Sequence, residues 1–191
     1  VWQQYSQYTL TGANAYFTKL ASTKGNVTPP LPVDGGQLVL AATKALTLGA
    51  TLNASAGAGG APAEVDIASQ DIQITGNGAA ALPGYLQIGS DALDSLTAGS
   101  LLIGGTRSAT SSGVMITPIA NSVVVSNDGS TPLKGPEILL VTKTDASNGD
   151  PKAADGFRVD AGASIAPQGH YPAAQDRPNP VTRSAAARRR A

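Results

Sequence analysis

The chain has 191 residues, no cysteine, and 13 basic against 13 acidic residues. The lack of cysteine excludes disulfides and thiolate metal sites. Its 22 glycines and 13 prolines disfavour long helices, and a hydrophobic content of 41% argues against a disordered chain.

Residues 1–32 form an aromatic lead-in. This segment contains the only tryptophan and four of the seven Tyr and Phe residues: Trp2, Tyr5, Tyr8, Tyr16 and Phe17. The proline-rich string TPPLP then interrupts regular structure. We expect the segment to pack its aromatic rings on the following domain and to cap it. Because the chain begins with valine and shows no signal peptide, we also expect it to be a piece of a longer protein.

Residues 33–166 form the body. Apolar residues recur at every second position in short runs such as QLVL, EVDIAS and DIQITG, which predicts strands with one buried face. Strand starts recur at steps of about 24 residues, in the range of solenoid repeats. The strand starts aligned in this way are Leu38, Val65, Leu86, Val114, Ile138 and Phe157. The sequence therefore predicts an all-β fold, a parallel β-solenoid over 33–166. A β-sandwich is the alternative.

The string LLIGGTRS raises the possibility of a phosphate-binding loop. No helical pattern follows it, so the N-terminal amides that would bind an anion are missing. We instead expect a corner between strands. Leu101 and Ile103 point into the core, and Gly104 and Gly105 turn the chain where a Cβ would clash. Arg107 remains outside and pairs with a carboxylate of a neighbouring coil.

Carboxylates along the body could serve a polysaccharide-cleaving enzyme. Glu64, Asp66 and Asp71 are the candidates, with Asp66 expected to face outward. No stacked carboxylates accompany them, so a hard cation would lack its six to eight oxygen ligands. The segment 145–156 resembles a calcium loop in composition only, because its spacing breaks the EF-hand pattern. We expect no catalytic, cofactor-binding or metal-binding residues.

Residues 167–191 form an extended basic tail. It holds the only histidine, His170, in the irregular string QGHYP, where a solvated residue is expected and no histidine-based site can form. Five arginines lie in 176–191 against one aspartate, so the rest of the chain is mildly acidic. An acidic body disfavours nucleic acid as a partner. No apolar run approaches the about 20 residues that a transmembrane helix needs.

Three strings in the body resemble a known family. GGQLVLAATKALTLGATLNASAGAGG, VDIASQDIQITG and LDSLTAGSLLIGGTRS are similar to filamentous haemagglutinin-type adhesins, the large exoproteins of bacterial two-partner secretion. The order of LTAGSLLIGGTRS, ILLVTK and FRVDAGASIAPQG resembles a region near the C-terminal end of such exoproteins. The resemblance covers about residues 33–166.

The resemblance implies an elongated right-handed parallel β-helix that is not an enzyme. It implies a segment of a secreted adhesin at the bacterial cell surface, a rigid repeat scaffold for attachment. The implied partners are an outer-membrane pore during secretion, and glycans or proteins on host or neighbouring cells. Two alternatives stay open: a polysaccharide-active β-helix enzyme, and the stalk of a contact-dependent toxin-delivery exoprotein.

Overall fold

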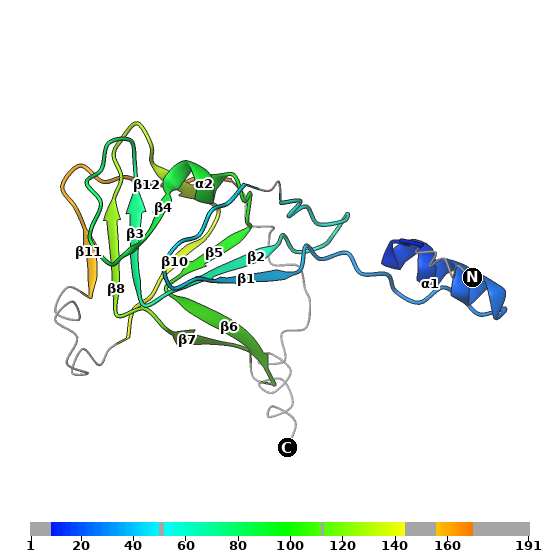
Figure 1. Cartoon of the computed structure of the whole chain (residues 1–191). Helices are drawn as coiled ribbons and strands as arrows, with labels where there is room; N and C mark the ends of the chain where they lie inside the picture. Colours follow the sequence, from blue (N-terminus) through cyan, green and yellow to red (C-terminus); the bar gives the residue numbers. More distant parts are fainter. Residues whose placement is uncertain (1–8, 50–51, 112, 144–155, 170–191) are drawn as a thin grey trace, which may run out of the picture.

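Two four-stranded sheets form the body of the protein (Figure 1). The structure is a computed structural model that describes residues 9–49, 52–111, 113–143 and 156–169. The first sheet has the order β1-β2-β5-β10, with β1 (Gln37–Ala41), β2 (Glu64–Ala68), β5 (Ser100–Ile103) and β10 (Ile138–Leu140). The second has the order β11-β8-β3-β4, with β11 (Phe157–Val159), β8 (Ser122–Ser126), β3 (Asp71–Thr75) and β4 (Leu86–Gly89).

Two further pairs of strands and two helices complete the described part of the chain. β9 (Leu133–Gly135) and β12 (Ile165–Pro167) pair in parallel. β6 (Gly105–Thr110) and β7 (Gly113–Pro118) form an antiparallel pair that leaves the two large sheets. The helices are α1 (Ala13–Thr23) and the single-turn α2 (Ser90–Asp94). Within the described ranges, no helix is both long enough and apolar enough to cross a membrane.

The strand register places apolar residues in rows across each four-stranded sheet. All pairs in these two sheets are parallel. In the first sheet, Val65 lies opposite Leu38 on one side and Leu101 on the other, and Leu101 lies opposite Ile138. In-register residues of neighbouring strands face the same side of a sheet, so these side chains form one continuous apolar row.

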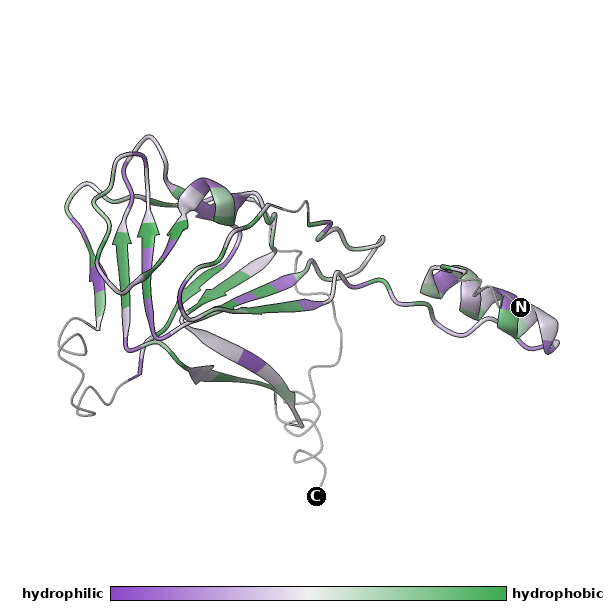
Figure 2. Ribbon diagram, in the orientation of Figure 1, coloured by the Kyte–Doolittle hydropathy of each residue, from purple (hydrophilic) through white to green (hydrophobic). Residues whose placement is uncertain are grey.

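The hydrophobic core lies between the inner faces of the two sheets. β2 contributes Val65 and Ile67, which belong to one buried cluster with residues of the second sheet: Ile72, Ile74, Val123 and Val125. Figure 2 shows hydrophobic residues on strands of both sheets. The period-two pattern therefore identified the core-facing residues of β2 and β3 correctly, but the alternate positions predicted to meet water, Asp66 and Gln73, are buried too.

The predicted fold class is wrong. The described strands fall into several small sheets, one of them antiparallel, and two helices belong to the described structure, so it is not an all-β, elongated right-handed parallel β-helix. The structure departs from the predicted parallel β-helix at the strings GTRSAT and GVMITP, which pair with each other as an antiparallel hairpin and do not join a parallel sheet. The alternative β-sandwich is wrong too, because both four-stranded sheets are parallel.

The predicted alignment of strand starts is correct only in part. Leu38 lies opposite Val65 as expected. The other neighbour of Val65 is Leu101, whereas Leu86 lies opposite Ile72 in the second sheet. Apolar alternation identifies strands without specifying their partners, because every such strand offers a similar buried face.

The aromatic lead-in contains α1. Tyr16 and Phe17 contact each other edge to face, with ring centroids 5.5 Å apart. Both rings remain about half exposed, so the expected packing of these two rings on the body is not observed. Figure 1 shows α1 to one side of the sheets. Trp2, Tyr5 and Tyr8 lie outside the described residues.

Candidate functional site

The string LLIGGTRS forms a corner between β5 and β6, as the sequence predicts. Leu101 and Ile103 are buried in the core. Gly104 has a φ of +98°, and a Cβ at this position would lie 2.0 Å from the carbonyl oxygen of Val141. At Gly105, a Cβ would lie 2.7 Å from the carbonyl oxygen of Thr117. Both glycines are therefore required by close backbone contacts.

Arg107 pairs with a carboxylate, but it is buried and not exposed as predicted. Its Nε donates to Asp66 Oδ1 at 2.7 Å, and its backbone N–H donates to Asp66 Oδ2 at 2.8 Å. Its Nη1 donates to Ser100 Oγ at 2.8 Å and lies 3.7 Å from Glu64 Oε1. The side chains of Arg107 and Asp66 are 4% and 0% exposed. Two opposite charges can be buried here because each satisfies the other.

The three carboxylates considered for catalysis do not gather into an open site. Asp66, expected to face outward, is fully buried against Arg107. Asp71 is in β3 of the other sheet, opposite Ser122. Among the described residues, no group of three or more His, Asp or Glu side chains could hold a metal ion. His170 and positions 145–155 of the calcium-like segment lie outside the described residues.

Gln73 is a buried amide that fixes a loop to the second sheet. Its Nε2 donates to the carbonyl oxygen of Ala80 and to Ser126 Oγ, both at 2.8 Å. Its Oε1 accepts the backbone N–H of Leu82 at 2.8 Å. The side chain thus holds residues 80–82 against β3 and β8.

Asn127 performs the same role at the end of β8. Its Nδ2 donates to the carbonyl oxygens of Thr131 and Ser164 at 3.0 and 2.8 Å, and to Ser90 Oγ at 3.0 Å. Its Oδ1 accepts the backbone N–H of Ser164 at 2.9 Å. One buried side chain therefore joins α2, the loop after β8 and the approach to β12.

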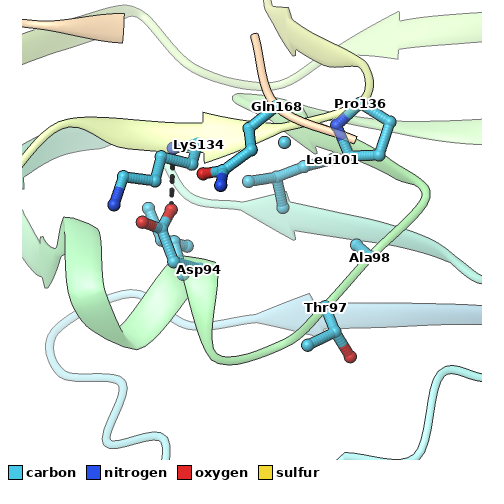
Figure 3. A pocket seen from close by; sticks show the side chains of 9 residues that line it. Asp94, Thr97, Ala98, Leu101, Lys134, Pro136 and Gln168 are labelled. Carbon is cyan, nitrogen blue, oxygen red and sulfur yellow. Dashed lines mark hydrogen bonds between the residues drawn. The ribbon is translucent and has the colours of Figure 1, made fainter. Parts of the chain in front are cut away.

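A pocket of about 360 Å³ lies beside α2, β9 and the residue that follows β12 (Figure 3). Its apolar lining comes from four residues: Leu93, Ala98, Leu101 and Pro136. Leu93 and Leu101 also belong to the hydrophobic core, so the pocket wall is continuous with the rigid interior. We regard this pocket as the candidate functional site.

The polar lining of the pocket combines a carboxylate, an ammonium group and an amide. Asp94 Oδ1 accepts the backbone N–H of Lys134 at 2.8 Å. Burial raises the pKa of Asp94 above its ordinary value, and the negative charge of Asp91 adds to this effect. The N–H and the ammonium group of Lys134 act in the opposite direction. In Figure 3 the amide of Gln168 lies on the same side of the pocket as these two side chains.

Thr97 carries backbone strain at the pocket wall. Its φ of +49° is the only positive φ of a non-glycine residue in the described ranges. A β-branched residue rarely adopts this left-handed conformation, and strain of this kind is concentrated at functional sites. Its backbone N–H donates to the carbonyl oxygen of Asp94 at 3.1 Å, which closes the turn after α2.

Sequence reasoning did not identify Asp94, Lys134 or Gln168. No spacing motif connects them, since Asp94 and Lys134 are 40 residues apart. They meet only because β9 packs beside α2 and β12 pairs with β9.

Comparisons with protein-family models, with curated proteins and with solved structures find no match.

Proposed function

We propose that this chain is a segment of a secreted bacterial surface adhesin, in which the sheets form a rigid scaffold for attachment to cells or surfaces. One observation carries the proposal: four strongly buried polar side chains bind the chain's own strands and loops. These are Asp66, Gln73, Arg107 and Asn127. Fully paired buried networks make a fold rigid and specific.

Exposed apolar side chains on the β6–β7 hairpin support a role in surface contact. Val114, Met115 and Ile116 are 62%, 53% and 38% exposed in β7. Val114 and Ile116 lie on one face of β7 and Met115 on the other. Exposed apolar side chains that share a face are typical of interaction surfaces. Many weak contacts of this kind along a surface protein add up to strong attachment through avidity.

The secretion route is part of the same proposal. Its support is the similarity of residues 33–166 to exoproteins of two-partner secretion. The proposed partners are an outer-membrane pore during export, and glycans or proteins of host or neighbouring cells afterwards. The proposed location is the bacterial cell surface. Delivery of a toxin by a related stalk would use the same scaffold and differs only in the domain that it carries.

The enzymatic alternative named Asp66 as one of three candidate carboxylates, with Glu64 and Asp71. The Asp66 carboxylate is fully buried, and both of its oxygens accept hydrogen bonds from Arg107. A polysaccharide cannot reach it without breaking this contact. The burial of Asp66 therefore favours the scaffold over catalysis at this position.

The test is an adhesion assay with the full chain coupled to beads. We expect coated beads to bind cultured epithelial cells or bacterial cells above the level of beads coated with heat-denatured chain. Replacing Val114 and Met115 with threonine should reduce binding, while the same change at the exposed Val27 of the lead-in should not. Binding no stronger than that of denatured chain, or turnover of pectin-like polymers, would overturn the proposal.

A further inference from the structure

We propose that the pocket beside α2 and β9 binds one ring of a neutral saccharide. The inference deepens the proposed function and rests on it, because it names the ligand class through which the scaffold attaches. Four properties of the pocket support it: its size, its paired charges, the free hydrogen-bonding capacity of its polar side chains and its apolar wall.

The size of the pocket fits one small ligand. Its volume of about 360 Å³ lies near the lower end of the range for ligand sites. A ligand the size of a single sugar ring can fill such a volume, whereas a long chain would extend into solvent. Terminal sugar rings of cell-surface glycans meet this condition.

The charges of the pocket favour a neutral, hydroxylated ligand. Asp94 and Lys134 lie side by side. The carboxylate therefore repels an anionic ligand, and the ammonium group repels a cationic one. A hydroxyl group donates and accepts, so neighbouring hydroxyls of one ring can donate to Asp94 and accept from Lys134. The Gln168 amide provides one further acceptor and two further donors.

The hydrogen-bonding capacity of these three side chains is only partly used within the described part of the chain. Asp94 uses one carboxylate oxygen for the backbone of Lys134. The hydrogen bond of Gln168 is made by its backbone N–H, which donates to the carbonyl oxygen of Gly135 at 3.0 Å. The side-chain amide of Gln168 and the ammonium group of Lys134 have no hydrogen-bond partner among the described residues.

The apolar wall fits the carbon face of a sugar ring. Leu101, Pro136 and Ala98 line this side of the pocket, so C–H groups of a ring would be removed from water there. The wall is rigid because Leu101 is part of the core, and backbone hydrogen bonds fix the main chain at Lys134 and Gln168, whose side chains supply two of the polar groups. A preformed site loses less conformational entropy when a ligand binds.

The test uses ligand-observed NMR on the full chain with D-glucose, D-galactose and D-mannose. D-Galacturonate and D-glucosamine serve as anionic and cationic comparisons. We expect at least one neutral hexose to bind, and its charged analogues to bind about tenfold more weakly or worse, since a single unfavourable charge contact is enough for this loss.

Two variants locate the binding in the pocket. Gln168→Ala and Lys134→Ala should each weaken hexose binding about tenfold, the loss expected for one hydrogen bond to a charged or amide group. Both keep the backbone bonds at these positions. The matched controls Gln70→Ala and Lys44→Ala change exposed residues that do not line the pocket and should leave binding unchanged.

The outcomes separate this inference from the proposed function. Cell adhesion without binding of any hexose overturns the saccharide pocket and leaves the adhesin proposal standing. Hexose binding without adhesion supports the pocket and overturns the adhesin proposal. Equal binding of the charged analogues, or equal losses in the control variants, overturns the pocket.

Discussion

Asp66 accepts two hydrogen bonds from Arg107, from Nε at 2.7 Å and from the backbone N–H at 2.8 Å, with both residues buried. The two residues are 41 positions apart, and the contact joins β2 of the first sheet to β6 of the hairpin. The ion pair therefore fixes the direction in which the hairpin leaves the body.

Replacing Arg107 with methionine should destabilise the protein by about 3–5 kcal/mol, because the Asp66 charge would remain buried without its partner. Urea unfolding followed by circular dichroism measures this loss. The double variant Asp66→Leu/Arg107→Met should be much less destabilised than Arg107→Met alone.

Arg158→Met is the matched control. Arg158 pairs with Asp160 at 2.8 Å but is 41% exposed, so its loss should cost about 1 kcal/mol or less. Equal effects at the two arginines would contradict the assigned role.

Replacing Gly104 with alanine should destabilise the protein by more than about 2 kcal/mol. The added Cβ would collide with the Val141 carbonyl oxygen, and the positive φ would add strain. Gly89→Ala is the control, because its Cβ would meet nothing within 4 Å and its φ is −69°. Thermal unfolding measures both variants. A Gly104 variant as stable as the Gly89 variant would show that the corner is not constrained.

Replacing Asn127 with alanine should cost about 2–4 kcal/mol, because three buried or partly buried backbone groups of Thr131 and Ser164 lose their partner at once. Asn53→Ala is the comparison, since Asn53 is exposed and its Oδ1 accepts one local N–H from Ser55. That change should stay within about 0.5 kcal/mol. Hydrogen exchange should also show earlier opening near Ser164 in the Asn127 variant. Unchanged exchange there would contradict its role in joining the loops.

Asp128 should contribute to the acid sensitivity of the fold. Hydrogen bonds from the Ser130 side chain and backbone, and from Thr131, hold the pKa of Asp128 below its ordinary value. A lowered pKa in the folded state gives stability above the unfolded value near 3.8 that is lost as the pH falls through the folded value. Asp128→Asn should therefore lose less stability than the parent chain between about pH 5 and pH 2. Identical losses would rule out this contribution.

Hexose binding should weaken as the pH falls toward the raised pKa of Asp94. Burial is the main cause of the raised pKa, Asp91 also raises it, and Lys134 opposes both. Protonation of Asp94 removes the acceptor charge, so affinity should begin to fall at a pH above 3.8. Ligand-observed NMR between about pH 7 and pH 4 measures this dependence. Asp94→Asn keeps an oxygen for the Lys134 N–H and should bind more weakly at pH 7, with a flatter profile. A profile that matches the parent chain would exclude Asp94 from the site.

The sequence predicted burial better than it predicted strand partners. The alternation in EVDIAS correctly placed Val65 and Ile67 in the core, and Asp66 on the opposite face. That face was expected to meet water, but β6 packs over β2 and covers it. Periodicity describes the two faces of one strand, so it contains no information about a second layer formed by a hairpin further along the chain.

The pocket could not be predicted from the sequence for a related reason. Asp94 ends a one-turn helix, Lys134 lies in a three-residue strand, and Gln168 follows another. Each is an ordinary polar residue in its own segment. Only the three-dimensional packing of these elements places the three side chains at one pocket.

The wide sequence separation of paired strands has a consequence for how quickly the protein folds. β2 needs β1 on one side and β5 on the other, and the Gln37 side chain bonds to the carbonyl oxygen of Arg107, 70 residues away. The chain must lose the conformational entropy of closing these loops before the distant contacts can stabilise it, so folding is intrinsically slow. During that delay the chain stays unfolded, which is the state that the proposed export through a narrow pore requires.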